Sequence, residues 1–579
     1  MATSRDPAIQ IRSPPIHGAQ LIDDKQGVAG PAAGEGPGKG PGDRWSWRSV
    51  LRYWRWSALP FGVLYLILLA VQFRGLVTNV NLDADAVSAP VIGQLFGSAG
   101  PHASVVLGEF AWHATLLFEL ATKWLPLHRE IWEATPYLMA LAGVALAAWS
   151  VWQLAGRFAA SLTAVLLICA APGTLRLLLS MTQHAPDWFC LALLAALLVL
   201  LERRATTLRP TVLVALAVVV GTIVGVNAAS DLLVVIAGLA PFTVAVLATY
   251  VLVRGPDSLR ALQAALGTLV VTGIAWVITD VVMNGLNVIP EPGLSTTTLA
   301  GASQIATNFK LWWHSIAVLG NGDYFGRDPS FTSGLAVVCA ALSIGAVVAL
   351  PVVAWRELRV RASTRAARMA PARLAFIVFW CSSAVLLSVA FLLSATPVDI
   401  HADRYLVGLI YAAAAVIPVI AAGRPATRAV ALVCTCIFAL GGVISMAQGT
   451  VARNVSGFPS VAVADQIAGL AARNDLKFGY SGYWDAAPIT WASHLRVEVF
   501  PVSVCDRNAR LCPFDLHYIS SWYTPRSGIR SFLLTDPALA LVSAPTPDLG
   551  PPSAVYHVGG ITMYVYPYDV ATKIVPLAK

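Results

Sequence analysis

Two aspartates separated by a single residue stand just beyond the first long apolar stretch, in Asn81-Leu82-Asp83-Ala84-Asp85. In an extended or turn segment, this spacing places two carboxylates side by side. One of them can take a proton while the other orients a hydroxyl group or a cation. The alternative is that these residues only cap a helix at about 87–96, which Asn and Asp do well. Asp83 and Asp85 are the first candidates for acid–base chemistry.

Other ionisable side chains collect at the same set of ends of the apolar stretches. A charge deep in lipid costs several kcal/mol, so such residues mark where water and ligands are admitted. The opposite ends carry almost only Arg. The mixed ends carry Arg74, Asp83, Asp85, Arg176, His184, Asp187, Asp231, Asp280, His314, Asp399, His401, Asp403 and Arg404. An active site is therefore expected at this membrane surface and not at the bilayer centre.

The composition identifies the elements that must position these side chains. Of the 579 residues, 57% are hydrophobic and 12% are charged, against about 25% charged in soluble proteins. The mean hydropathy is +0.68. The apolar residues form runs of about twenty, the length that crosses a hydrocarbon core of about 30 Å. These values exclude an ordinary soluble enzyme and predict a polytopic α-helical membrane protein.

About eleven transmembrane helices are predicted from these runs. They cover approximately residues 58–78, 136–154, 158–179, 186–201, 210–227, 232–253, 262–283, 332–355, 374–393, 404–422 and 428–447. The third and fourth spans carry the weakest signal, because Pro172 and Gly173 interrupt the third and Pro186 begins the fourth.

Basic residues give the orientation of these spans, because loops rich in Lys and Arg stay in the cytoplasm. Arg residues precede the first span and recur in every second loop. This pattern predicts a cytoplasmic N-terminus and an extracytoplasmic C-terminal region. The Ala- and Arg-rich composition suggests a bacterial inner (plasma) membrane. The net charge of +8 points to anionic lipid head groups of the bilayer as partners, with no role for nucleic acid.

Three regions follow from this topology. Residues 1–47 are rich in Gly, Pro and Ala and are expected to form a disordered cytoplasmic tail. Residues 48–447 form the transmembrane domain, with a first outer loop at 79–135 and a second at 284–331. Residues 448–579 form an extracytoplasmic C-terminal domain.

The C-terminal domain is expected to be a small α/β unit. A helical pattern covers about 460–473 and an alternating pattern covers 495–499. Gly559-Gly560 joins two strand candidates, 554–558 and 561–566, as a hairpin. Cys505 and Cys512 flank a short loop, and an oxidising compartment favours a disulfide between them. The alternative is two free thiols.

The order of these features resembles the GT-C superfamily of integral-membrane glycosyltransferases. The shared features are a tail, a first span, an Asp pair just outside it, a long loop with amphipathic helices, further spans and an outer C-terminal domain. Support is strongest over about 58–200 and weaker over Asp399–Tyr405. These enzymes use sugars carried on a polyprenyl phosphate. The resemblance implies a GT-C-like domain and inverting transfer of such a sugar to a hydroxyl of a glycan, lipid or protein.

The same resemblance implies that a first-loop Asp is the general base, a role that falls to Asp83 first and to Asp85 second. The departing lipid phosphate requires cationic donors, and the Arg fork engages two phosphate oxygens at once. Arg404 is the leading candidate, followed by Arg176 and His401. For Arg404 the alternatives are an ion pair with a neighbouring Asp or an interfacial anchor, and for Arg176 snorkelling to the head groups.

Four further residues are candidates for the sugar or acceptor pocket. His184 and Asp187 share a tight outer turn and can shape that pocket or bind a divalent cation together with Asp85. No dense ligand cluster is visible in the sequence, so the sequence leaves metal binding undecided. The alternative for Asp187 is that it only lies in the first turn of the next helix, where the helix dipole favours an acidic residue. Glu109 and His113 share a helix face and can reach the pocket together. The alternative is that this helix only packs or anchors at the membrane interface.

Two other classes of membrane protein have a similar span count. A transporter or flippase typically shows repeated halves and polar groups near the midplane, whereas this sequence has no internal repeat and few mid-span charges. A non-catalytic glycan-assembly protein remains as the third class. No nucleotide-binding motif is visible, which agrees with a donor that is already activated on lipid.

Overall fold

The computed structural model describes twelve stretches of the chain. They are residues 56–81, 84–98, 103–107, 112–171, 184–253, 256–290, 298–363, 371–397, 400–448, 459–505, 510–539 and 541–576. All of them belong to one compact unit, Leu51–Lys579. Within these stretches, the side chains of residues 73–81, 98, 112, 256, 290, 360–363 and 401 are not described.

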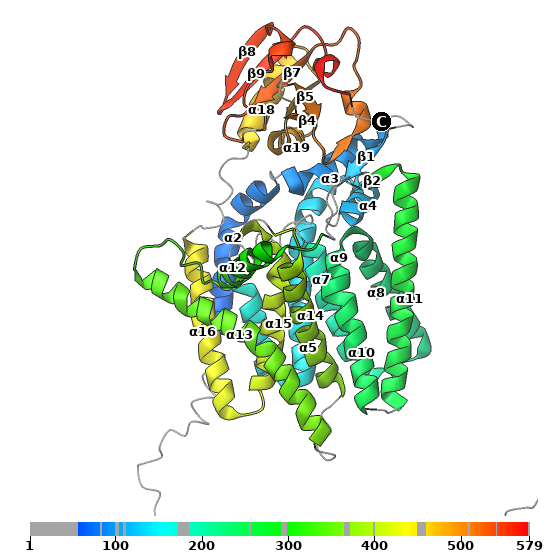
Figure 1. Ribbon diagram of the computed structural model, residues 1–579, viewed down its shortest axis with the longest axis vertical. Helices are drawn as coiled ribbons and strands as arrows, with labels where there is room; N and C mark the ends of the chain where they lie inside the picture. Colours follow the sequence, from blue (N-terminus) through cyan, green and yellow to red (C-terminus); the bar gives the residue numbers. More distant parts are fainter. Residues whose placement is uncertain are drawn as a thin grey trace, which may run out of the picture. The chain divides into compact units, whose positions relative to one another are not determined.

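The protein is a polytopic helical membrane protein (Figure 1). Among the described residues, nine helices have the length and composition to cross a membrane. They are His128–Ile168, Ala185–Arg204, Pro210–Ser230, Leu232–Val253, Asp257–Gly285, Phe331–Arg359, Pro371–Leu393, Ala402–Ala421 and Pro425–Ala447. Each overlaps a predicted span, which confirms the membrane class expected from the sequence.

Two differences separate these nine helices from the eleven predicted spans. Helix α2 (Leu59–Asn81) matches the first predicted span, but its described apolar part, Leu59–Gln72, is short. The second and third predicted spans are continuous as α5 (His128–Ile168). Within α5, Gly156 has φ 84° and ψ 178°, a non-helical conformation that costs glycine little. The break therefore lies at one glycine, with no loop to separate two helices.

Helix α7 (Ala185–Arg204) is the central helix of the bundle. It packs against α5, α14 (Pro371–Leu393) and α15 (Val407–Ala421). Within its most apolar 18 residues, 83% are buried. This agrees with the rule that a helix apolar on all sides is surrounded by other elements. This burial fixes the first turn of α7, where the predicted site residues His184 and Asp187 lie.

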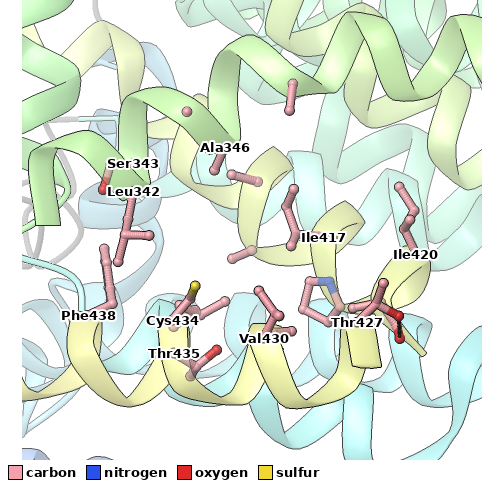
Figure 2. A pocket seen from close by; sticks show the side chains of 18 of the residues that line it. Leu342, Ser343, Ala346, Ile417, Ile420, Thr427, Val430, Cys434, Thr435 and Phe438 are labelled. Atoms are coloured by element: carbon pink, nitrogen blue, oxygen red, sulfur yellow. Dashed lines mark hydrogen bonds between the residues drawn. The ribbon is translucent and has the colours of Figure 1, made fainter. Parts of the chain in front are cut away.

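Three helices enclose an apolar pocket elsewhere in the bundle. They are α13 (Phe331–Ser363), α15 and α16 (Pro425–Ala447). Figure 2 shows their side chains facing a common space. The loop between α15 and α16 forms one end of that space.

Outside the spans, a small three-stranded sheet joins distant parts of the chain. Strand β1 (Val105–Leu107) pairs in parallel with β2 (Val288–Pro290) and antiparallel with β6 (Tyr518–Ile519). Helices α3 (Ala84–Leu95) and α4 (Trp112–Thr122) pack together beside it. The first outer loop, the region after α11 (Pro256–Gly285) and the C-terminal region thus share one sheet.

The C-terminal region is an α/β domain, as predicted, with a six-stranded sheet in the order β5-β4-β3-β7-β9-β8. The strands are β3 (Phe478–Gly482), β4 (Glu498–Val504), β5 (Leu511–Pro513), β7 (Ser531–Thr535), β8 (Ala554–Val558) and β9 (Ile561–Tyr566). Helices α18 (Val461–Arg473) and α19 (Tyr483–Ala492) complete it. Gly559 and Gly560 turn the predicted hairpin with φ of 55° and 92°.

The alternating segment Leu495–Val499 was predicted as a strand, but β4 begins only at Glu498. Leu495 lies in a left-handed conformation with φ 57° in the turn before the strand. A disulfide joins Cys505 to Cys512. It crosses the connection between β4 and β5, which pair antiparallel up to Val504 and Leu511.

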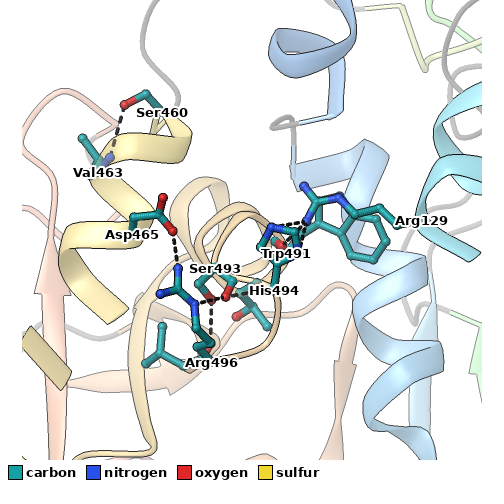
Figure 3. A network of polar contacts seen from close by, with 10 residues as sticks. Arg129, Ser460, Val463, Asp465, Trp491, Ser493, His494 and Arg496 are labelled. Carbon is teal, nitrogen blue, oxygen red and sulfur yellow. Dashed lines mark hydrogen bonds and ion pairs between the residues drawn. The ribbon is translucent and has the colours of Figure 1, made fainter. Parts of the chain in front are cut away.

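A cation from α5 contacts the C-terminal domain directly (Figure 3). The Arg129 Nη1 donates to the Trp491 carbonyl at 3.3 Å and lies 2.9 Å from the His494 Nδ1. Its guanidinium carbon is 5.1 Å from the centre of the Trp491 ring. In the same view, Arg496 pairs with Asp465 of α18. Helix α19 also packs on α3, which adds a contact between the domain and the first outer loop to the pairing of β6 with β1.

Helix α8 (Pro210–Ser230) packs closely along α11 (Pro256–Gly285), and two glycines permit this approach. A Cβ atom at Gly221 would lie 2.8 Å from the Val271 Cβ, and one at Gly225 would lie 2.7 Å from the Ala275 Cβ. Glycines four residues apart allow such backbone proximity in membranes.

We expect Gly225→Leu to lower the Tm of the detergent-solubilised protein by on the order of 5 °C, because the two helices must separate. Gly273→Leu is the matched control on α11, since a Cβ there meets nothing within 4 Å. Thermal unfolding followed by intrinsic fluorescence measures both. Equal Tm values for the two variants would contradict the packing role of Gly225.

Candidate functional site

A buried cluster of one imidazole and two carboxylates lies where α7 begins. His184 immediately precedes α7 in a left-handed conformation with φ 66°, and Asp187 lies in the first turn of the helix. Asp231 separates α8 from the short helix α9 (Leu232–Val234) and accepts the Leu233 amide at 2.8 Å. The His184 Nδ1 lies 2.9 Å from the Asp187 Oδ2 and 2.6 Å from the Asp231 Oδ2.

The charge of this cluster is unbalanced. His184, Asp187 and Asp231 are 1%, 0% and 5% exposed, respectively. Burial alone lowers the pKa of His184, but the two carboxylates, Asp231 above all, raise it to about 9. Burial acts to raise the pKa of Asp231, yet the opposing charge of His184 leaves it below the usual value. One imidazolium offsets only one of the two carboxylates, which leaves room for a further cation or proton.

The same three side chains form a potential metal site. Their ligand atoms all lie within 4.8 Å of one another. The Asp187 Oδ1 is buried and makes no hydrogen bond in the structure. Imidazole and carboxylate ligands together suit a divalent ion such as Zn²⁺ or Mn²⁺. The sequence had paired His184 and Asp187 with Asp85 as possible ligands, whereas the structure brings Asp231 to them.

Asp85 lies in the first turn of α3 and is partly exposed. The Tyr483 hydroxyl donates a hydrogen bond of 2.6 Å to the Asp85 Oδ1. Tyr483 belongs to the first turn of α19, and its ring stacks on Phe514 with the ring centres 4.6 Å apart. The C-terminal domain therefore contributes a side chain to the surroundings of Asp85, the second candidate for the base.

Arg404 lies in the 3₁₀ segment η3 (Ile400–Leu406), directly before α15. Its Nη2 donates to the Tyr405 hydroxyl at 3.2 Å, and its guanidinium carbon is 5.1 Å from the centre of the Tyr405 ring. The charges of Asp85 and Asp403 both act on this guanidinium. The structure thus places the predicted base and the predicted phosphate ligand within electrostatic reach of each other.

Tyr405 connects the two groups of residues. The centre of its ring lies 5.3 Å from that of His184, at an interplanar angle of 60°. Because Tyr405 also contacts Arg404, contacts run from Arg404 to the buried cluster, and the charge of Asp85 acts on the Arg404 end. Four residues that the sequence predicted for the site, Asp85, Arg404, His184 and Asp187, are brought together in this way.

Four other predicted site residues cannot be compared with this set. Asp83, Glu109 and Arg176 lie outside the described residues. The backbone of His401 belongs to η3, but its side chain is not described.

His113 lies at the start of α4, next to the end of α8. The backbone amide of the following residue, Ala114, donates to the Ser230 Oγ at 2.9 Å. Ser230 directly precedes Asp231 in the chain. Burial lowers the pKa of His113, against the opposing charge of Asp280. His113 therefore approaches the buried cluster through the backbone of the α8–α9 junction.

Three residues of the site were not singled out as site candidates from the sequence. Asp231 was visible only as one of many charges at span ends, and its pairing with His184 depends on how α7 packs against α8. Tyr405 adjoins Arg404, but its contact with His184 is tertiary. Tyr483 lies 398 residues from Asp85 along the chain, and no local pattern predicts such a contact.

A second buried carboxyl holds the helix that carries Asp85. Glu119 of α4 accepts a hydrogen bond from the Gln94 amide of α3, and the Lys123 Nζ donates to the Gly93 carbonyl at 3.1 Å. The Glu119 side chain is fully buried. Burial raises its pKa to about 7, against the opposing effects of Gln94 and Lys123. Glu119 therefore serves to dock α4 on α3.

Comparisons with known proteins were made on both sequence and structure. No protein-family model matches the chain, and no curated protein matches its sequence. The structure is similar to that of ArnT from Cupriavidus metallidurans bound to undecaprenyl phosphate, with a TM-score of 0.47 and 14% identity. That match covers 86% of this chain and 97% of the other. The apo form of the same protein matches with a TM-score of 0.41 and 14% identity over 88% and 98% of the two chains.

A third match is the oligosaccharyltransferase of Archaeoglobus fulgidus tethered to an acceptor peptide. Its TM-score is 0.43 and its identity 12%, over 91% of this chain and 75% of the other. At such identities and scores these matches assign this chain neither a substrate nor a residue role, so both are inferred below from its own side chains.

The raised pKa of Glu119 predicts a pH-dependent contribution to stability. The folded protein keeps a proton that the unfolded chain releases, so this contribution falls as the pH rises from about 4.5 to about 7. Glu119→Gln keeps the hydrogen bonding without the titration. Between about pH 5 and about pH 8, we expect the Tm of the wild type to fall further than that of the variant, by on the order of 2 °C.

Glu130→Gln is the control for this measurement, because Glu130 is an exposed residue of the neighbouring helix α5. Its Tm is expected to follow that of the wild type across the pH range. A Glu119→Gln variant whose Tm also follows the wild type would show that Glu119 carries no extra proton in the folded state.

Proposed function

We propose that this multi-pass membrane protein is a glycosyltransferase that moves a sugar from a polyprenyl monophosphate to an acceptor hydroxyl by an inverting mechanism. The proposal rests on the proximity of Asp85 to Arg404, whose guanidinium lies within the electrostatic influence of the Asp85 carboxylate. A carboxylate suits a hydroxyl that must lose a proton, and a guanidinium suits a phosphate that gains charge. Transfer from a lipid phosphate needs both groups in one place.

In this mechanism, Asp85 takes the proton from the acceptor hydroxyl as the hydroxyl oxygen attacks the anomeric carbon. The bond between that carbon and the phosphate oxygen breaks, and the electron pair leaves with the polyprenyl phosphate. Arg404 stabilises the charge that develops on the phosphate. Attack from the face opposite to the leaving group inverts the anomeric configuration. Asp83, which the sequence placed first as base, stays a second candidate.

The contact between Asp85 and Tyr483 bears on how an acceptor enters. The Tyr483 hydroxyl donates to the Asp85 Oδ1 at 2.6 Å, which is the kind of contact that an acceptor hydroxyl makes with its base. An acceptor must therefore replace Tyr483 at this oxygen or use the other carboxylate oxygen. The C-terminal domain is proposed to contribute to acceptor binding through this residue.

The cluster of His184, Asp187 and Asp231 is proposed to hold a divalent cation. The unpartnered Asp187 Oδ1 and the close spacing of the three ligand groups support this assignment. When bound, such a cation would supply positive charge near the phosphate of the donor. The three residues themselves hold the start of α7 against the α8–α9 junction, and Tyr405 connects them to Arg404.

The proposed reaction takes place on the outer side of a bacterial inner membrane, with the N-terminus in the cytoplasm. This orientation rests on the bias of Arg toward the opposite loops. The acceptor is a hydroxyl of a glycan, a lipid or a protein. The donor and acceptor classes are tested directly by the first experiment below.

Asp85→Asn is expected to lower transfer by at least about 100-fold, because a positioned base contributes about 10² to 10⁴ in rate. Purified protein in liposomes is given a panel of polyprenyl-phosphate sugars and a membrane glycan extract, and release of free polyprenyl phosphate is measured. Asp83→Asn is assayed in parallel to decide which aspartate acts as the base.

The matched control for this assay is Asp328→Asn, an exposed aspartate of the second outer loop. It is expected to retain wild-type activity. If wild-type protein consumes none of the donors, or if Asp83→Asn and Asp85→Asn are both as active as the wild type, the proposed function is wrong. Transport or glycan binding would then be the next activity to assay.

For the cation, we expect purified protein to retain about one equivalent of a divalent metal, measured by mass spectrometry of the elements. Asp231→Asn is expected to lose at least half of that metal, whereas Asp328→Asn keeps it. Wild-type protein that is free of metal after purification, and that binds no Zn²⁺ or Mn²⁺ on titration, would contradict the assignment. This readout does not depend on knowing the sugar donor.

A further inference from the structure

A large apolar pocket lies among α13, α15 and α16, away from the candidate site. Its volume is about 560 Å³. Side chains from the three helices face it, among them Ala346, Ile417, Val430 and Phe438 (Figure 2). The pocket belongs to the membrane-spanning part of the protein, because all three helices are candidate spans.

Two of the hydroxyl side chains that line the pocket have partners within the protein. The Ser343 Oγ donates to the Gly320 carbonyl at 3.2 Å. The Thr427 Oγ1 lies 2.8 Å from the Ala421 carbonyl and 2.9 Å from the Arg424 carbonyl. These two hydroxyl groups are thus occupied, and most of the remaining lining is apolar. Water gains little in such a space, whereas a hydrocarbon chain fills it favourably.

One end of the pocket opens at the turn between α15 and α16. Ala426 and Thr427 line the pocket and are also exposed at this turn. Two cations accompany them: Arg424 is exposed, and the Arg428 Nε donates to the Ala422 carbonyl at 2.7 Å. An apolar cavity whose mouth carries two guanidinium groups complements a molecule with a hydrocarbon chain and an anionic head group.

The length of α15 separates this mouth from the candidate site. The helix has 15 residues between η3, which carries Arg404, and the turn that carries Arg424. At 1.5 Å per residue, this distance is about 22 Å. The proposed donor phosphate at Arg404 and the mouth of the pocket therefore lie at opposite ends of one span, near opposite leaflets.

From these observations we propose that the pocket binds an acyl chain of an anionic phospholipid from the leaflet at the α15–α16 turn, with its phosphate at Arg424 and Arg428. In the predicted orientation this is the cytoplasmic leaflet. The proposal is independent of the sugar-transfer reaction, because it uses none of the residues of the candidate site. The bound chain fills the space among three spans and so stabilises their packing.

The test is photolabelling of the full-length protein in liposomes. Phosphatidylglycerol with a diazirine in its acyl chain is the probe, and labelled peptides are identified by mass spectrometry. We expect labels on α13 and α16 at the pocket. Ala346→Trp fills the cavity and should reduce this labelling by at least about fivefold. Val348→Trp is the control, because Val348 is 55% exposed on the same helix and does not line the pocket.

Two further measurements complete the test. Arg424→Gln should reduce the preference for phosphatidylglycerol over phosphatidylcholine carrying the same chain, whereas Arg209→Gln, an exposed arginine of another loop, should not. If the Ala346→Trp variant has the Tm of the wild type and its labelling is unchanged, the proposal is wrong. If that variant fails to fold, equal labelling of the wild type by the two lipids would overturn it. Displacement of the probe by polyprenyl phosphate, but not by phosphatidylglycerol, would also overturn it.

Discussion

The cost of placing a charge in hydrocarbon governs this structure. An isolated ionised group in the bilayer is unstable, so the carboxylates and cations of the site gather where helices begin and end. His184 precedes α7, Asp231 separates α8 from α9, and Arg404 precedes α15. Even there, two buried carboxylates require the imidazole of His184 between them. The packing of apolar helices thus determines where His184, Asp231 and Arg404 lie.

Side chains from four separate regions build this site, and each region is held by a different kind of contact. The buried surface of α7 holds His184 and Asp187. The docking of α4 on α3 through Glu119 holds Asp85. Tyr405 lies between Arg404 and His184, while Tyr483 reaches Asp85 from the C-terminal domain. A change in any of these contacts alters the geometry of the others, because they form one connected set.

The sequence predicted those parts of the structure that local patterns determine. Runs of about twenty apolar residues predicted the spans, and Gly559-Gly560 predicted a hairpin because both residues adopt positive φ. The break at Gly156 was expected as a loop between two spans, since a single residue carries no length signal. Asp85, Arg404, His184 and Asp187 were singled out because they are ionisable residues at the outer ends of spans, in a paired spacing, a tight turn or a segment that resembles GT-C enzymes. Asp231 and Tyr483 were not, since their roles depend on tertiary packing that no spacing in the sequence encodes.

The three-stranded sheet of β1, β2 and β6 has a consequence for how the chain is made. Ser104 and Ser520 exchange contacts beside this sheet, with the Ser104 amide 2.9 Å from the Ser520 Oγ, although 416 residues separate them. Synthesis from the N-terminus delivers β1 long before β6 exists. Until then β1 has an unpaired edge, and exposed edges invite association with other chains. All the spans must therefore be synthesised and inserted before β6 can pair with β1. The first outer loop thus depends on the C-terminal region, which is synthesised late, to complete its sheet.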